Sequence, residues 1–322
     1  MRPLFTMGLV VLALAQLPLT VHPQGQTGAP LAGARFEHVA IAARDASRAV
    51  QELAGILGVV PSTSNDGSGT FTLSTADLRI DVTQPAGDAG PTHAFLDRHG
   101  PGIEHLGFAV AGPIVERVRA LEQRGGQVIA GDAAGPRALV AFPTAGLTIE
   151  IVRAASAPAG LGASPSATAL GSRKMSHVGF VYRDAQPAIA TLATLLGIPA
   201  PSLTTFTPID YRPGDASDRS AHVRYAFIST GGVGIEVIEP VGGPSPWMDF
   251  VTARPSGGAH HLAFTFTAQD DGFDATVRHL QAKGGRWRKG MRGVEGAKSG
   301  SSPEFEFLAT LGLVIEVTKS GV

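Results

Sequence analysis

The stretch from Gly234 to Phe264, GIEVIEPVGGPSPWMDFVTARPSGGAHHLAF, joins two segments in which apolar residues alternate with others. The first segment carries an acid between apolar residues, and the second opens on a histidine pair. The stretch from Leu78 to Phe108, LRIDVTQPAGDAGPTHAFLDRHGPGIEHLGF, has the same features in the same order. Because repeats of this length define the architecture of a whole chain, we expect the protein to be built from repeated units.

Four segments of the chain open alike, each with a histidine in a strand-like pattern. Their alternation is typical of a strand that is buried on one face. The residue two positions after each histidine is small, and bulky apolar residues occupy the alternate positions. We therefore expect the bulky face to pack in a core and the histidine face to stay open. The histidines and their small partners are His38 and Ala40, His105 and Gly107, His177 and Gly179, and His261 and Ala263.

Each opening strand is followed by a helical pattern and then by two or three strand-like stretches. Two of the helical patterns begin at Asp45 and Asp184, which are good N-cap residues, and end before Gly58 and Gly197, which are good C-cap residues. The last strand of every unit carries an acid between apolar residues. These acids are Asp81, Glu150, Glu236 and Glu316. A strand, a helix and several strands, repeated four times, predict an α+β fold.

A low-complexity segment rich in Ala, Gly, Ser and Pro separates the second unit from the third. The sequence therefore predicts a first domain over residues 35–153, a linker over 154–173 and a second domain over 174–319. Each domain would be a pair of βαβββ units that form a cupped mixed sheet. Whether the units pair within or between domains, and whether the protein is a monomer with paired domains or a homodimer, is left open.

The composition limits the classes of partner. A chain of 322 residues is long enough for two domains with cores of their own. A net charge of −1 provides no electrostatic footprint for nucleic acid. The absence of cysteine excludes disulfides and thiolate metal ligands. The expected partner is a small-molecule substrate, and any metal would be held by nitrogen and oxygen.

The N-terminus has the pattern of a signal peptide. Arg2 is followed by an apolar run from Leu4 to Ala15, and residues 13–15 read Ala-Leu-Ala. We expect cleavage at about residue 15 or later, a leader over residues 1–34, and export to the periplasm or the medium without membrane attachment. A membrane anchor continuing to Val21 is the alternative, and polar residues in the run make it the weaker one.

The repeated histidines and acids give two matched sets of candidate metal ligands. Two imidazoles and two carboxylates suit a divalent ion such as Zn, Mn, Fe, Ni or Co. A single strand histidine is more often structural, and a single strand acid usually faces solvent. Eight matched positions favour metal binding, with a decayed site as the competing interpretation, above all in the first domain. The first set is His38, Asp81, His105 and Glu150, and the second is His177, Glu236, His261 and Glu316.

Three motifs, HVAI…LGV, PSPWMDF running into HHLAF, and the closing GLVIEV, resemble the vicinal oxygen chelate superfamily. That superfamily includes glyoxalase I, methylmalonyl-CoA epimerase, extradiol dioxygenases and fosfomycin-resistance proteins. The resemblance covers both domains and implies tandem glyoxalase-like domains in which the same eight residues ligate a divalent metal. The second set is similar to the ligands of bacterial glyoxalase I. The first set departs from them at Asp81, which is one methylene shorter than glutamate.

The resemblance also implies a chemistry. In the superfamily a metal chelates two neighbouring substrate oxygens and stabilises an enolate or oxyanion, and a carboxylate moves a proton at the adjacent carbon. Carried over, this makes Glu316 a ligand and the candidate base, with Glu236 the next choice, unless both are ligands only. The implied activity is that of an isomerase, epimerase or lyase on a small oxygenated substrate. Export argues against a CoA thioester as that substrate.

Two alternatives remain. One is an extradiol-type Fe(II) ring-cleaving dioxygenase, with His177, His261 and Glu316 as a facial triad. Against it, Glu236 would crowd a coordination position, and residues 305–308 read Phe-Glu-Phe-Leu where a tyrosine is expected. The other alternative is a non-catalytic protein that binds a small molecule in the same cleft.

Overall fold

The computed structural model describes residues 28–63, 69–154, 169–206, 222–267, 269–270, 272–289 and 302–319. The expected signal peptide and most of the expected linker lie outside these residues, so export and the linker stay predictions. In the part of the chain that is described, no helix has the length and apolar character needed to cross a membrane.

The first half of the chain forms one mixed sheet of eight strands. Its centre is the antiparallel pair of β1 (Arg35–Ala42) and β5 (Gly102–Val110). On either side a parallel neighbour follows, β4 (Arg79–Thr83) next to β1 and β8 (Leu147–Arg153) next to β5. Antiparallel strands complete the two edges. They are β3 (Phe71–Ser74) and β2 (Ser62–Thr63) beyond β4, and β7 (Arg137–Phe142) and β6 (Gln127–Gly131) beyond β8.

The second half repeats this arrangement in a second sheet of eight strands. The central antiparallel pair is β9 (Lys174–Val181) and β13 (Gly258–Phe266). The parallel neighbours are β12 (Gly234–Gly242) and β16 (Leu313–Lys319). The outer strands are β11 (His222–Ile228) and β10 (Thr204–Phe206) on one side, and β15 (Glu304–Phe307) and β14 (Arg286–Lys289) on the other. Two βαβββ units therefore pair within each half, and the predicted α+β fold is confirmed.

Six helices accompany the sheets in the described residues. They are α1 (Ala46–Leu57), α2 (Pro91–His99), α3 (Val115–Glu122), α4 (Gln186–Leu196), α5 (Pro246–Ala253) and α6 (Gly272–Ala282). Asp45 caps α1 as predicted, since its side chain accepts a hydrogen bond from the Arg48 N–H, and Gly58 ends the helix in the left-handed conformation. The prediction of Asp184 as the N-cap of α4 is wrong. The N-cap is Ala185, and Asp184 instead accepts a hydrogen bond from the Gln186 N–H.

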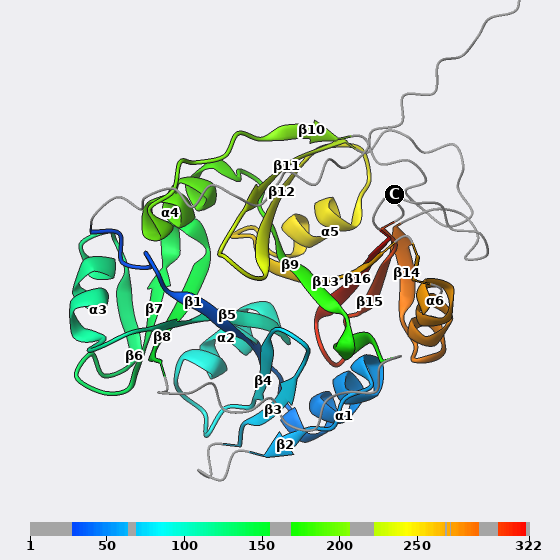
Figure 1. Cartoon of the computed structure of the whole chain (residues 1–322), viewed down its shortest axis with the longest axis horizontal. Coiled ribbons are helices and arrows are strands. Elements are labelled where there is room, and N and C mark those ends of the chain that lie inside the picture. Colours follow the sequence, from blue (N-terminus) through cyan, green and yellow to red (C-terminus); the bar gives the residue numbers. More distant parts are fainter. Residues whose placement is uncertain are drawn as a thin grey trace, which may run out of the picture.

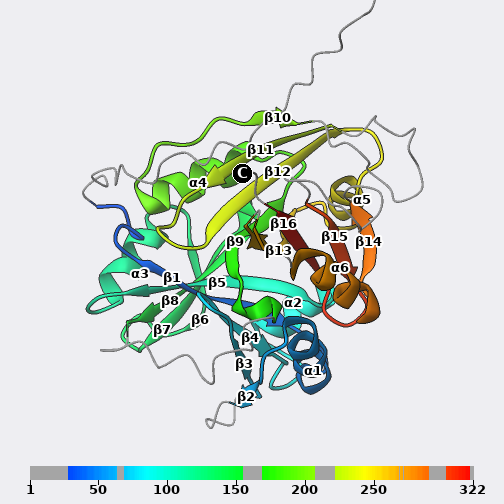
Figure 2. The same cartoon turned by 45° about the vertical axis from the view of Figure 1, so that its right-hand side comes forward.

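The two halves share one hydrophobic core and are tied together by polar contacts. Strands β5 and β13 lie against each other, and α1 lies beside α6 in both views (Figures 1 and 2). His279 on α6 lies 3.1 Å from the Gly55 carbonyl oxygen of α1. Arg254 donates hydrogen bonds from Nη2 to the carbonyl oxygens of His99 at 2.7 Å and Pro101 at 2.9 Å. The fold thus holds both sheets in a fixed mutual arrangement.

The register of the central strands accounts for the small residue after each histidine. Gly179, for example, lies opposite His261 on β13 and beside Glu236 on β12. Each of the other three small residues likewise stands between a histidine of the partner unit and an acid of the parallel strand. The remaining sets are Ala40 with His105 and Asp81, Gly107 with His38 and Glu150, and Ala263 with His177 and Glu316.

The small residues do not keep the histidine face open, and that expectation is wrong. His38 is 1% exposed and His261 is 0% exposed. The imidazoles of His38 and His261 fill the space above Gly107 and Gly179 of the partner units. The register therefore brings two histidines and two acids onto one face at the centre of each sheet.

Candidate metal centre

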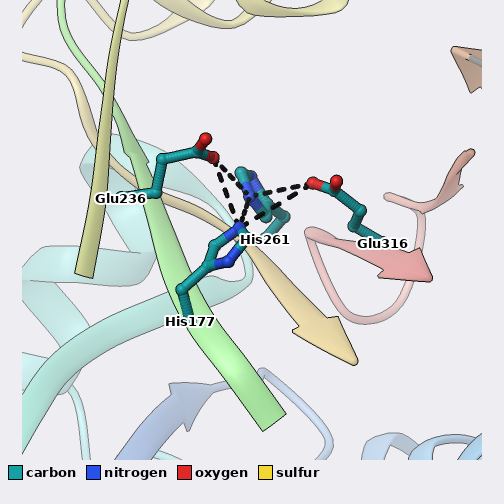
Figure 3. A group of neighbouring side chains, drawn as sticks. All are labelled: His177, Glu236, His261 and Glu316. Atoms are coloured by element: carbon teal, nitrogen blue, oxygen red, sulfur yellow. Dashed lines mark hydrogen bonds and ion pairs between the residues drawn. The ribbon is translucent and has the colours of Figure 1, made fainter. Parts of the chain in front are cut away.

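Four side chains from four strands converge in the second half (Figure 3). The two Nε2 atoms of His177 and His261 lie 3.2 Å apart. The Glu236 Oε2 atom lies 3.3 Å from each of them. The Glu316 Oε2 atom lies 3.3 Å from His261 Nε2 and 3.9 Å from His177 Nε2. All four predicted ligand residues of this half are therefore within reach of one point.

Neighbouring polar groups orient these side chains. The Nδ1 atom of His177 lies 2.9 Å from the Ser176 hydroxyl oxygen, and Nδ1 of His261 lies 3.0 Å from Nδ1 of His260. The Thr318 hydroxyl donates a hydrogen bond of 3.2 Å to Glu316 Oε1. Partners on the outer nitrogens fix the ring orientation of metal-binding histidines and leave Nε2 for the metal. His177 and His261 likewise have a polar partner at Nδ1 and direct Nε2 toward the centre of the group.

The electrostatics of the group follow from its burial and its mixed charges. Burial by itself raises the pKa of the Glu236 carboxyl, but the imidazoles of His177 and His261 outweigh it and hold that pKa well below its ordinary value. Burial by itself lowers the pKa of His261, but the carboxylates of Glu236 and Glu316 raise it overall. The Glu236 carboxylate thus stays ionised, and the site favours positive charge beside it.

The donor set fits a divalent cation. Imidazole nitrogens and carboxylate oxygens are the ligands of Zn and of the neighbouring transition metals. The ligand atoms all lie within 4.8 Å of one another, and Glu316 and both histidines are buried. A dense group of buried acids is costly unless a cation balances it. The four residues could therefore hold a metal, with Glu236 and Glu316 on opposite sides of the two rings (Figure 3).

Two further residues belong to this surrounding, and sequence reasoning missed both. Glu304 is fully buried and is the cross-strand partner of Glu316, so its side chain lies on the same face of the sheet. It contributes to the raised pKa of His261. Phe227 is the cross-strand partner of Glu236, is 47% exposed, and its ring centroid lies 5.3 Å from that of His177.

A signal for these two residues was present in the sequence. Glu304 and Glu306 alternate with Phe305 and Phe307, which is the pattern of a strand with one acidic face. Phe227 follows Tyr225 by two positions, and in a strand that spacing places both rings on one face. Neither pattern reveals which strand lies next to a ligand strand, so only the sheet order identifies the two residues.

The first half brings together three of its four predicted ligands. His38, His105 and Glu150 have ligand atoms within 4.8 Å of one another, and His38 Nε2 lies 3.1 Å from Glu150 Oε2. Asp81 is outside this group, with its Oδ2 atom 4.0 Å from His38 Nε2. The Asp81 carboxylate instead accepts hydrogen bonds from the Thr72 hydroxyl at 2.8 Å and from Arg79 Nε at 3.1 Å.

Arg79 gives the first site a different chemistry. Its Nη2 atom lies 3.1 Å from Nδ1 of His38. A guanidinium only donates hydrogen bonds, so Nδ1 is the acceptor, and the proton of a neutral His38 ring then lies on Nε2. That proton points to Glu150, whose pKa is lowered because His38, His105 and Arg137 outweigh the effect of burial. The donor set of the first half thus fits a metal less well than that of the second.

Comparisons with known proteins agree with this architecture. The family model described as the Glyoxalase/Bleomycin resistance protein/Dioxygenase superfamily matches residues 37–142 and 176–300, one region in each half. No curated protein sequence matches the chain significantly.

Solved structures of similar fold include three dioxygenase-type or synthase proteins. A mutant of 4-hydroxymandelate synthase from Streptomyces coelicolor has a TM-score of 0.63 and 18% identity, covering 89% of this chain and 92% of that one. A xylose isomerase-like TIM barrel/4-hydroxyphenylpyruvate dioxygenase fusion protein has a TM-score of 0.57 and 14% identity, covering 94% of this chain and 52% of that one. BphC, a halotolerant catechol dioxygenase, has a TM-score of 0.51 and 14% identity, covering 89% and 87%. At these identities the likeness is one of fold.

Proposed function

Because the chain belongs to the Glyoxalase/Bleomycin resistance protein/Dioxygenase superfamily, we propose that it is a metal-dependent enzyme with its active centre in the second half. The proposed reaction is a proton transfer on a small oxygenated substrate, of the isomerase, epimerase or lyase type. One observation carries the proposal. Two imidazoles and two carboxylates from four strands meet with all their ligand atoms within 4.8 Å of one another.

In this proposal His177, His261 and Glu236 hold the ion, and Glu316 completes the set. A bound divalent cation would supply the Lewis-acid charge that favours loss of a proton from a carbon next to a carbonyl or carboxyl group. The donor types suit Zn, Mn, Fe, Ni or Co alike. The second half is preferred to the first because, among the described residues, no guanidinium contacts the ring of His177 or His261.

Glu316 is the proposed base, and Glu236 is the proposed ligand only. The Glu236 carboxylate contacts both Nε2 atoms at 3.3 Å, whereas Glu316 contacts one at 3.3 Å and the other at 3.9 Å. The longer distance from Glu316 to His177 favours Glu316 as the carboxylate that accepts a proton from a substrate carbon. The Thr318 hydroxyl donates to Glu316 Oε1 and so orients this carboxylate.

Phe227 is proposed to contact the substrate. Its ring is almost half exposed and lies beside His177, so it adds apolar surface next to the candidate ligands. The neighbouring Tyr225 ring lies 5.7 Å from it, centroid to centroid, and extends the apolar surface. A substrate with a small apolar group next to its oxygen atoms would match this wall.

The experiment is proton exchange in D₂O. Metal-loaded protein is incubated with a panel of small 2-oxo and 2-hydroxy acids, and loss of the α-proton signal is followed by NMR. We expect exchange with wild type, and a loss of roughly 100-fold or more in Glu316→Gln, because general-base groups contribute about that much. Glu116→Gln, on the exposed face of α3, is the matched control and should exchange at the wild-type rate.

A ring-cleaving dioxygenase is the second candidate, favoured by the likeness of fold to a catechol dioxygenase over 89% of this chain and 87% of that one. His177, His261 and Glu316 would then act as the two-histidine, one-carboxylate triad. The position of Glu236, 3.3 Å from both histidines, argues against it because it fills a position that such sites keep open. Oxygen uptake by the Fe(II)-loaded protein with catechols, without proton exchange, would support this candidate and contradict the first.

Export of the chain remains a proposal that rests on the N-terminal sequence. It supports a small acid or carbonyl compound as substrate and argues against CoA thioesters. Metal binding without exchange and without oxygen uptake would leave a non-catalytic binding protein as the function.

A further inference from the structure

A cavity of about 200 Å³ lies between the two halves, and none of the four candidate ligands of the second half lines it. The first half lines it with residues of α2, β5, β7 and β8. The second half closes it with Phe180, Arg254 and residues 256–259. The lining includes the adjacent residues Glu104 and His105 of β5.

A β-bulge accounts for two consecutive side chains at one cavity. In the pairing of β1 with β5, Ala40 lies opposite His105 and Ile41 lies opposite Ile103, so Glu104 is an extra residue without a cross-strand partner. A bulge of this kind redirects a side chain that would otherwise point to the far face of the sheet, and bulges are common beside binding sites. Glu104 and His105 therefore both face the cavity region.

Only some of the polar side-chain atoms of Glu104 and His105 have a hydrogen-bond partner. The Glu104 side chain is 4% exposed, and its Oε2 atom accepts a hydrogen bond of 3.3 Å from the Thr92 hydroxyl. Within the described residues, Glu104 Oε1 and His105 Nδ1 are buried and have no hydrogen-bond partner. His105 Nδ1 lies 3.6 Å from Glu104 Oε2, which is too far for a hydrogen bond. Buried carboxyl oxygens are almost always paired in native proteins, so this pair is suited to a ligand.

The second half shows the same bulge with its polar atoms in contact. There His260 is the extra residue, and its Nδ1 atom lies 3.0 Å from Nδ1 of His261. In that position the bulged residue supports a histidine of the metal centre. Glu104 replaces such a histidine in the first half and leaves its neighbour unsupported. The two halves have therefore diverged at matching positions.

The lining determines the chemistry of a fitting ligand. The Glu104 carboxylate can accept a hydrogen bond from an O–H or N–H donor. Phe95, Phe142 and Phe180 give the cavity aromatic walls. Arg254 also lines it and disfavours a cation, while the Glu104 carboxyl disfavours an anion. Arg254 Nη2 is moreover already used by two backbone carbonyl groups.

We propose that this cavity is a second binding site, which takes a small neutral aromatic molecule through an O–H or N–H group directed at Glu104. The site is separate from the metal centre of the second half, because none of its lining residues belongs to that cluster, whereas His105 belongs to the group of the first half. Binding should consequently not depend on a metal held in the second half. The size of the cavity suits a single ring with one polar substituent, since a cavity of about 150 Å³ holds benzene.

Benzamide is the probe for this proposal, titrated into the full chain and followed by calorimetry and ligand-observed NMR. We expect saturable one-to-one binding with the same affinity in metal-loaded and metal-stripped protein. Benzoate, benzylammonium and toluene should each bind at least tenfold more weakly, because they carry the wrong charge or lack a donor.

Two variants test the position of the site. Glu104→Met keeps the unbranched stem and removes the carboxyl acceptor, so benzamide should bind at least tenfold more weakly. Ala141→Phe fills the cavity from β7 and should abolish binding. Glu116→Met, the same exchange on the exposed face of α3, is the control and should bind like wild type.

The proposal is overturned if benzamide shows no saturable binding to wild type, in which case the cavity holds solvent only. It is equally overturned if Glu104→Met and Ala141→Phe, both folded by circular dichroism, bind benzamide as tightly as wild type does. Equal affinity for toluene or for either charged probe would also contradict it.

Discussion

Gly179 leaves the space that the imidazole of His261 occupies. A Cβ atom on Gly179 would stand 1.8 Å from Cε1 of His261, although the backbone of Gly179 does not require glycine. The same relationship holds in the first half, where a Cβ on Gly107 would stand 1.9 Å from Cε1 of His38. Glycine is therefore needed at these two positions because a histidine ring occupies the space of a Cβ atom, and the backbone conformation does not require it.

Gly179→Ala should therefore displace the His261 ring and weaken metal binding. We expect an affinity loss of roughly 10- to 100-fold, which is the usual effect of disturbing the support of a metal ligand. Gly232→Ala is the control, because a Cβ there meets no atom within 4 Å. Competition with a chromophoric chelator measures both variants, and equal affinities would contradict the packing argument.

Metal content should distinguish the two halves. If the second half holds the ion, His261→Ala loses about one equivalent per chain, because a ligand imidazole is hard to replace. His38→Ala should retain the wild-type content, because Arg79 already occupies Nδ1 of His38. Elemental analysis after dialysis measures the metal content of both variants. If His38→Ala also contains about one equivalent less metal than wild type, the first half binds metal as well.

Removal of Arg79 should open the first site. In Arg79→Ala the Asp81 carboxylate loses its cation and His38 Nδ1 loses its donor. The His38 ring can then carry its proton on Nδ1 and offer Nε2 as a ligand. We expect the variant to bind one more divalent ion per chain than wild type, seen by titration with Zn²⁺ or Co²⁺. Arg119→Ala, on the exposed face of α3, should bind no more than wild type.

Metal binding should release protons. In the metal-free protein the pKa of His261 is raised above 6.5, so the stability that its protonated ring contributes is present below that pH and is lost as the pH rises through the folded pKa. A metal needs the neutral ring, so its affinity should rise over the same window. Glu236 adds no proton, because its pKa is lowered and it is already ionised. Calorimetry at about pH 7 in buffers of different ionisation enthalpy should show up to one proton released per metal.

Arg254→Ala should destabilise the contact between the halves. The exchange leaves the carbonyl oxygens of His99 and Pro101 without their donor in a part-buried position. We expect a loss of about 2–6 kcal/mol in the free energy of unfolding, at about 1–3 kcal/mol for each of the two unpaired groups. Arg119→Ala should change it by less than about 0.5 kcal/mol. Urea unfolding monitored by circular dichroism measures both.

Much of the fold and of the main site follows from local patterns. Period-two alternation around each histidine and each acid predicts strands, and Asp45 with Gly58 predicts the limits of α1. The repeat then predicts which residues are equivalent. His177, Glu236, His261 and Glu316 converge as the repeat suggested, because side chains of one parity share a face once the strands are adjacent.

The sequence by itself determined the strand parity, the order of the units and the types of side chain at each centre. Only the tertiary structure decided that units pair within a half, that Arg79 contacts both Asp81 and His38, and that a bulge places Glu104 beside a cavity. The physical reason is the sequence distance between the residues that interact. Alternation and capping depend on neighbours along the chain, whereas a guanidinium, a bulge and a cavity wall act through strands that are brought together only by folding.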